Sequence, residues 1–208
     1  MAQTKINNKQ LQADGWTLAT DSWTYASATT ITVDSGAAAI YSIGDKFKLT
    51  ANSVVLYGYI IGIADTLLTV IGDALTNHAF SATYYSKAAT PLGFPFYFQF
   101  TSTVTPGSGS FTTVSGTVDY FITGKEIFVE VYITITTNGT AASYIQCTLP
   151  IAPIRDTPMT GREMAVVGTL SNVKADNTLG AFILTATLTY PGGDGYELAA
   201  KGNYRYVA

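Results

Sequence analysis

The chain has 208 residues, of which 47% are hydrophobic and only 12% charged, and its formal net charge is −3. No apolar run approaches the roughly 20 residues that span a bilayer, so the low charge does not indicate membrane insertion. The 11 basic residues are scattered among 14 acidic ones, which argues against a basic patch for nucleic acid. The length permits one large all-β domain or two smaller ones.

The composition favours strands and turns. There are 32 threonines, 14 tyrosines and 19 glycines. Threonine and tyrosine suit pleated surfaces, while glycine supplies turns. The single cysteine rules out an intramolecular disulfide, and the N-terminal sequence MAQTKINNKQ lacks the apolar core of a signal peptide. We therefore expect synthesis in a reducing cytoplasm, without export through a signal peptide.

The first part of the chain predicts a polar arm at 1–15 and then short strands with turns. In TTITV (29–33), Ile31 and Val33 fall on one face. KFKLT (46–50) alternates apolar residues with lysines, which is typical of a half-buried strand. The segment SGAAAIYSIGDK (35–46) is predicted to turn, with Gly44-Asp45 just before the second of these strands.

A hairpin follows, with strands within 54–63 and 66–72 and a turn at Ala64-Asp65, and SATYYSK (81–87) adds a further strand. We therefore predict a small β-barrel or compact β-sandwich over residues 16–90. The Pro- and Gly-containing segment 87–97 predicts a connection, with the domain boundary near 88–96.

The clearest strand is EIFVEVYITIT (126–136), where five aliphatic residues alternate with Glu126, Phe128, Glu130, Tyr132 and Thr134. Asn138-Gly139 after it is the strongest short hairpin signal, so YIQCTLP is predicted to return as the next strand.

The remaining residues predict further β-structure. The Pro-rich segment 150–163 is predicted as a loop, and strands are predicted within 164–170, 180–190 and 202–207, with a sharp turn at 191–195. Together these elements predict a jelly-roll-like antiparallel β-sandwich over residues 96–208. The whole chain is thus expected to be all-β.

Residues for chemistry are sparse. His78 is the only histidine and no GxSxG motif lies near it, so a histidine-dependent nucleophile is not expected. One histidine and one cysteine, Cys147, cannot form a usual zinc site, and Asp194 suits a turn better than a calcium site. Glu126 and Glu130 would lie about 13 Å apart on their strand, too far for a glycosidase pair, although Asp119 could approach one of them across a hairpin. We predict no enzyme, metal or cofactor.

The face of 126–136 that carries Phe128, Glu130 and Tyr132 is amphipathic although the opposite face already suits a core. Such a second face often meets another subunit. Partial burial under a neighbouring loop is the other interpretation. Both interpretations stay open at the level of the sequence.

Residues 15–95, with WTYASATTITV, YSIGDKFKLT, YGYIIGIADTLLTVIG and YYSKAATPLGFP, resemble a segment of tailed-bacteriophage virion proteins of the fibre, tail-appendage and head-decoration types. The C-terminal KEIFVEVYITITTNGT and GNYRYV resemble the knob-like β-sandwiches that end many phage fibres. The resemblance implies a homotrimeric, non-enzymatic protein that contacts capsid or tail proteins. It also implies assembly in the bacterial cytoplasm, location in the virion, and display or host attachment.

A carbohydrate-binding module, or a receptor-binding tip for host-surface glycans, is the alternative. Exposed tyrosines can stack on sugar rings. The candidates in or beside loops are Tyr144, Tyr190, Tyr196 and Tyr204, each of which could instead be a cross-strand packing residue. Because the chain is short and has no heptad or collagen-like shaft, a capsid-bound fibre or stubby appendage is favoured over a long tail fibre.

Overall fold

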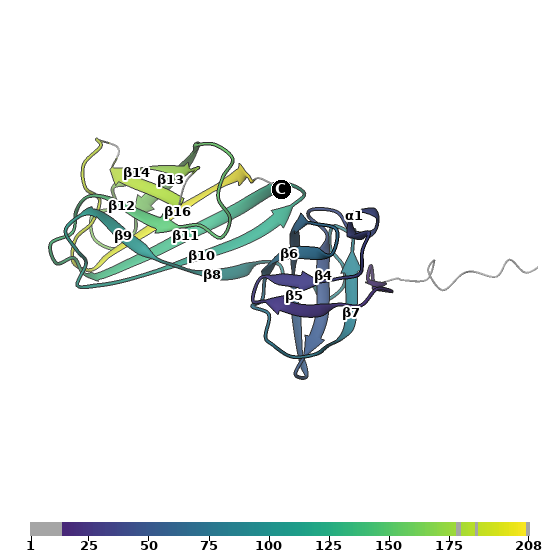
Figure 1. The fold of residues 1–208 in the computed structure, drawn as a ribbon. Coiled ribbons are helices and arrows are strands. Elements are labelled where there is room, and N and C mark those ends of the chain that lie inside the picture. Colours follow the sequence, from purple (N-terminus) through teal and green to yellow (C-terminus); the bar gives the residue numbers. More distant parts are fainter. Residues whose placement is uncertain (1–13, 178–179, 186, 207–208) are drawn as a thin grey trace, which may run out of the picture. The chain divides into compact units, whose positions relative to one another are not determined.

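The computed structural model describes residues 14–177, 180–185 and 187–206 and shows an all-β protein, as the sequence predicts (Figure 1). Most of the expected polar arm lies outside the described residues. The chain divides into two compact units, of which the first reaches Phe96 and the second begins at Tyr97. Each unit contains one antiparallel sheet.

The first unit has a seven-stranded sheet in the order β1-β7-β4-β5-β6-β3-β2. The edge strands β1 and β2 are only five residues apart in sequence, so the sheet must curl to bring its edges near each other. The curled sheet encloses a core that includes Ile31, Phe47 and Leu68. The strand bounds are Thr17–Leu18 (β1), Thr24–Ser27 (β2), Thr30–Thr32 (β3), Lys46–Ala51 (β4), Val54–Ile63 (β5), Leu67–Gly72 (β6) and Phe80–Ser86 (β7).

The predicted hairpin is confirmed, with β5 and β6 paired on either side of the turn at Ala64-Asp65. Asp65 also stabilises the segment expected to be only a turn, because its Oδ1 accepts a hydrogen bond from Gly36 N (2.8 Å). That segment contains a single turn of helix, α1 (Ala37–Ile40), whose Ala37 is fully buried.

The lysine face of β4 is more covered than the half-buried strand predicted from its alternation, since Lys46 is buried and Lys48 and Thr50 are partly buried. Lys46 is only 8% exposed. Lys48 Nζ lies 4.7 Å from the ring centroid of Trp16 and 4.6 Å from that of Tyr84. Trp16 is itself buried, and its Nε1 donates to Leu92 O (2.8 Å). Segments distant in sequence therefore cover this face with aromatic rings, and burial lowers the pKa of Lys46.

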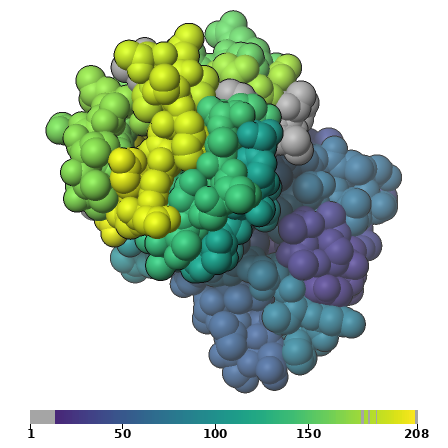
Figure 2. Space-filling view, turned by 90° about the vertical axis from the view of Figure 1, so that its left-hand side faces the viewer, coloured from purple at the N-terminus to yellow at the C-terminus, as the bar shows by residue number. Residues whose placement is uncertain are grey.

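The second unit has a nine-stranded sheet in the order β8-β10-β11-β16-β13-β14-β15-β12-β9. Only Thr103 separates the two edge strands, so the sheet must roll up on itself. Figure 2 shows the C-terminal strand in yellow, with β11 on one side and the lighter green of β13 on the other. The strand bounds are Phe98–Ser102 (β8), Val104–Ser108 (β9), Thr113–Thr123 (β10), Glu126–Thr137 (β11), Ala142–Thr148 (β12), Thr157–Glu163 (β13), Leu170–Asp176 (β14), Gly180–Thr185 (β15) and Tyr196–Arg205 (β16).

The alternation predicted for β11 is confirmed. All five of its aliphatic side chains are buried inside the rolled sheet: Ile127, Val129, Val131, Ile133 and Ile135. The other side chains of β11 therefore form part of the outer face of the sheet, which is solvent-accessible to different degrees along the strand.

The hairpin predicted at Asn138-Gly139 is wrong in its pairing. The chain does turn there, and Gly139 has a left-handed φ of 64°. However, β11 pairs with β10 and β16, so neither of its edges is free. The next strand, β12, pairs instead with β9 and β15.

The segment 150–170 also differs from its prediction. The last seven residues of the predicted loop 150–163 form strand β13. Conversely, 164–169 was predicted as part of a strand but is irregular, and β14 begins only at Leu170. The predicted strand at 180–190 ends at Thr185, where the chain turns and Leu188 N donates to Thr185 O.

Candidate functional site

The three residues predicted as an oligomer interface lie together on the outer face of β11, but in different settings. The ring of Phe128 is partly buried and stacks on Phe121 of β10, with the ring centroids 4.6 Å apart and the planes 5° apart. Tyr132 is 43% exposed, and its hydroxyl donates to Glu130 Oε2 (2.8 Å). This hydrogen bond raises the pKa of Tyr132 and fixes the direction of its ring.

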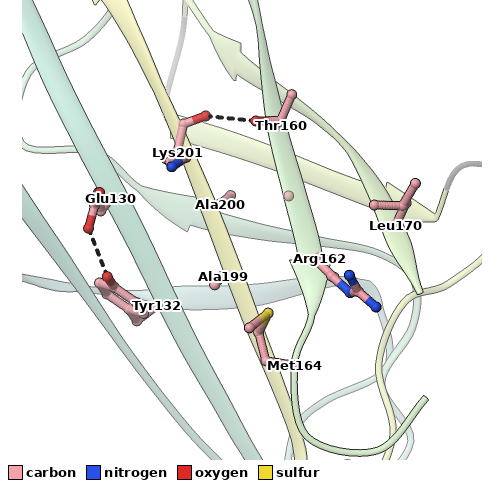
Figure 3. A pocket seen from close by; sticks show the side chains of 10 residues that line it. Glu130, Tyr132, Thr160, Arg162, Met164, Leu170, Ala199, Ala200 and Lys201 are labelled. Atoms are coloured by element: carbon pink, nitrogen blue, oxygen red, sulfur yellow. Dashed lines mark hydrogen bonds between the residues drawn. The ribbon is translucent and has the colours of Figure 1, made fainter. Parts of the chain in front are cut away.

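A groove of about 480 Å³ runs beside these residues over β11, β16 and β13 (Figure 3). The strand register explains it. Ala199 of β16 lies opposite both Tyr132 and Arg162, so a small side chain separates two large ones. Met164 and Leu170 also line the groove, at its end near Arg162.

The groove carries charges of both signs. Lys201 and Arg162 line it, and neither forms an ion pair with any residue of the described ranges. Glu130 lies opposite Lys201 in the register on one side and opposite Asp119 on the other. The guanidinium of Arg162 extends over Gly168. Thr160 also lines the groove, and its hydroxyl donates to Lys201 O (3.5 Å).

The loop 164–169 at the rim is organised by one carboxylate. Glu163 is 1% exposed. Its oxygens accept hydrogen bonds of 2.7 to 3.0 Å from four consecutive backbone N–H groups, those of residues 165–168. Burial alone would raise the pKa of Glu163, but these donors together lower it to about 2. The ionised carboxylate therefore holds the loop in a defined, irregular conformation.

This loop and the first residue of β14, Leu170, present aliphatic side chains to the solvent. Met164 is 61% exposed, Val166 57%, Val167 54% and Leu170 63%. The sequence missed this surface because MAVV has the composition of a strand. A glutamate immediately before it and Gly168, which adopts a left-handed φ of 65°, are the signals that could have indicated a turn.

The four tyrosines proposed for glycan contact do not form one exposed patch. Tyr204 is 2% exposed and donates to Ile151 O (2.7 Å), and burial raises its pKa. Its ring belongs to the core and is not available to a sugar. Tyr190 and Tyr196 are partly buried and pack over the glycines of the 191–195 turn. The ring of Tyr144 packs against Gly107.

The structure also shows the surroundings of His78, Cys147 and Asp194. His78 is exposed beside Thr76, and burial raises the pKa of Cys147 to about 11. Asp194 Oδ1 accepts from Asn138 N (2.7 Å) across two turns. In the described ranges, no cluster of three or more His, Cys, Asp or Glu could hold a metal ion. Nor is any described helix long and apolar enough to cross a membrane.

No family model, curated protein or solved structure matches this chain. The geometry of the groove and of the outer face therefore carries the functional argument.

Proposed function

We propose that the chain is a non-enzymatic structural protein of a bacteriophage particle. In this proposal the first unit joins the chain to other virion proteins. The second unit assembles with copies of itself, as a homotrimer, and serves display or host attachment. A capsid-bound fibre or decoration protein is favoured over a long tail fibre, because the two described units consist of compact sheets.

One observation carries the self-assembly part of the proposal. The outer face of β11 has a stacked pair, Phe121 and Phe128, followed by the partly exposed and oriented ring of Tyr132. Ordered aromatic side chains on an outer face are typical of protein interfaces, where aromatic residues are enriched. The particle assignment rests on the residue resemblance of 15–95, which the two-unit all-β architecture suits.

A host-surface glycan remains a second candidate partner. The observation that favours it is the turn 191–195, where Tyr190 and Tyr196 lie beside the exposed carboxylate Asp194. Such a combination of ring faces and hydrogen-bonding groups is what sugars require. Glycan binding by the purified chain that is lost in Tyr196→Ala would support this function.

Light scattering behind size exclusion tests self-assembly. We expect the wild type at three times the chain mass of 22.1 kDa. Phe128→Ser should elute as a smaller species, whereas Tyr144→Ser, a matched change on β12, should keep the wild-type mass. A wild-type chain that stays at 22.1 kDa would contradict self-assembly. Mass spectrometry of purified particles from the encoding phage tests the location, and absence from them would contradict the particle assignment.

A further inference from the structure

The outer face of the second sheet is divided by charge. Strands β10 and β11 carry three carboxylates and no cation: Asp119, Glu126 and Glu130. The outward side chains of β16, β13 and β14 include four cations and two carboxylates: Arg162, Lys174, Lys201 and Arg205, with Asp176 and Glu197. The sheet therefore has an acidic half, β10–β11, and a basic half, β16–β13–β14.

The two halves do not neutralise each other within the chain. Lys201 and Arg205 lie opposite Glu130 and Glu126 in the strand register, yet neither pair forms an ion pair. Each carboxylate of the acidic half accepts from a neutral donor instead: Gln99, Asn203 or Tyr132. Of the four cations of the basic half, only Lys174 is ion-paired among the described residues, with Asp156 and Asp176.

The apolar groups follow the same division. The acidic half presents the stacked rings of Phe121 and Phe128. The basic half presents the exposed aliphatic residues Met164 and Leu170 and the loop between them, which Glu163 holds in place. The groove at Ala199 lies where the two halves meet.

A closed ring of three copies requires two different surfaces on each copy, because a two-fold contact of one patch with itself ends at a dimer. The rolled sheet supplies two such surfaces, of opposite charge and with β16 at their junction. We infer that the acidic half of one copy docks on the basic half and the aliphatic loop of the next copy. This inference rests on the proposed self-assembly and names its two complementary surfaces.

The size of a stable contact supports an interface wider than β11. Specific protein interfaces bury about 800 Å² per partner and involve roughly 20–30 residues on each side, more than one face of a single strand contains. The aliphatic loop and the groove extend the contact across the sheet. Their apolar atoms would be removed from water, and Arg162 and Lys201 would meet carboxylates of the neighbouring copy.

Two single-surface variants test the inference. Phe128→Lys impairs the acidic half, because it removes a stacked ring and places a cation opposite the basic half, and the double variant Met164→Ser/Arg162→Glu impairs the basic half. We expect each variant alone to lose the wild-type oligomer and to elute as a monomer. The matched control Ile154→Ser changes another exposed aliphatic residue, in the loop before β13, and should retain the wild-type mass. Circular dichroism and thermal melting identify any variant that fails to fold.

Mixing the two impaired variants tests whether the acidic half of one copy contacts the basic half of another. Each chain keeps one intact surface, so a contact between different surfaces predicts a 1:1 heterodimer that cannot close into a ring. Absence of a heterodimer on mixing would overturn the inference, and a wild-type mass of two chains instead of three would show a two-fold contact in place of the closed ring. Oligomers that persist in the Met164→Ser/Arg162→Glu variant would also overturn it. A monomeric wild-type chain would instead contradict the proposed self-assembly itself.

Discussion

Strands β4 and β11 have the same kind of sequence but different surroundings. Both alternate buried apolar residues with polar or charged ones, and both bury their apolar face completely. In β4 the second face is also largely covered, because the rings of Trp16, Tyr84 and Phe94 lie over the lysines. In β11 the second face stays at the surface, with Tyr132 43% exposed. Alternation therefore specifies the core face, while distant segments decide whether the other face is covered.

The largest expected effect comes from removing the cover of β4. Trp16→Ala deletes a buried ring that packs against Tyr57, Phe94 and Lys48, so we expect a loss of about 3–5 kcal/mol in the unfolding free energy of the first unit. Both tryptophans lie in this unit, so the fluorescence of the remaining Trp23 in a urea titration reports its unfolding. The exposed control Leu18→Ala should change stability by less than about 0.5 kcal/mol. An equal effect of the two variants would contradict the covering role.

A smaller loss is expected when the organiser of the exposed loop is changed. Glu163→Gln replaces an acceptor-only carboxylate with an amide, which leaves some of the four loop N–H groups without a partner. We expect the unfolding free energy of the second unit to fall by about 2–3 kcal/mol. Chemical denaturation followed by circular dichroism measures this. Glu197→Gln, a surface carboxylate on β16, is the matched control and should behave as wild type.

The same carboxylate predicts a pH dependence. The pKa of Glu163 falls from 4.5 to about 2 on folding, so its contribution to stability is complete above pH 4.5 and is lost as the pH falls toward 2. A denaturation series across that range should show a steeper decline for wild type than for Glu163→Gln. Parallel declines in the two proteins would rule out this role.

Loss of a hydroxyl should lower the unfolding free energy by about 1 kcal/mol at a buried tyrosine and by much less at a partly buried one. Tyr204→Phe removes the buried hydroxyl that donates to Ile151 O, and leaves that carbonyl without this partner. Tyr196→Phe, at a partly buried position beside the 191–195 turn, should leave the unfolding free energy nearly unchanged. Equal losses of unfolding free energy in the two variants would contradict the assignment of Tyr204 to the core.

The smallest expected effect is on the uncovered face itself. Tyr132→Ser at low protein concentration should change the stability of the folded monomer by less than about 0.5 kcal/mol, since the ring is not part of the core. The same change should weaken self-association at higher concentration. A monomer destabilised as strongly as by Trp16→Ala would show that this face is covered within the chain.

The features that could be predicted from the sequence are those that depend on residues close together along the chain. The alternation of Ile127 to Ile135 and the hairpin at Ala64-Asp65 follow from local periodicity and turn chemistry, and both are confirmed. The pairing of β12 could not be predicted, because it depends on β10 and β16 already occupying both edges of β11.

The candidate site was predictable only in part. The amphipathic face of β11 is visible in the sequence, and the structure places Phe128, Glu130 and Tyr132 on its outer side. The groove depends on Ala199 lying between two larger residues of other strands, which is a matter of register. The aliphatic loop depends on one side chain overriding the strand tendency of MAVV, and Tyr204 is buried by its place in β16.

The mass of the purified chain in solution, measured by light scattering over a range of concentrations, shows whether copies of the chain cover the outer face of the second sheet. If other copies cover the outer face of the second sheet, the mass should approach three times 22.1 kDa. A mass of 22.1 kDa at every concentration would show that no second copy binds the outer face of the second sheet, and would contradict the proposed self-assembly.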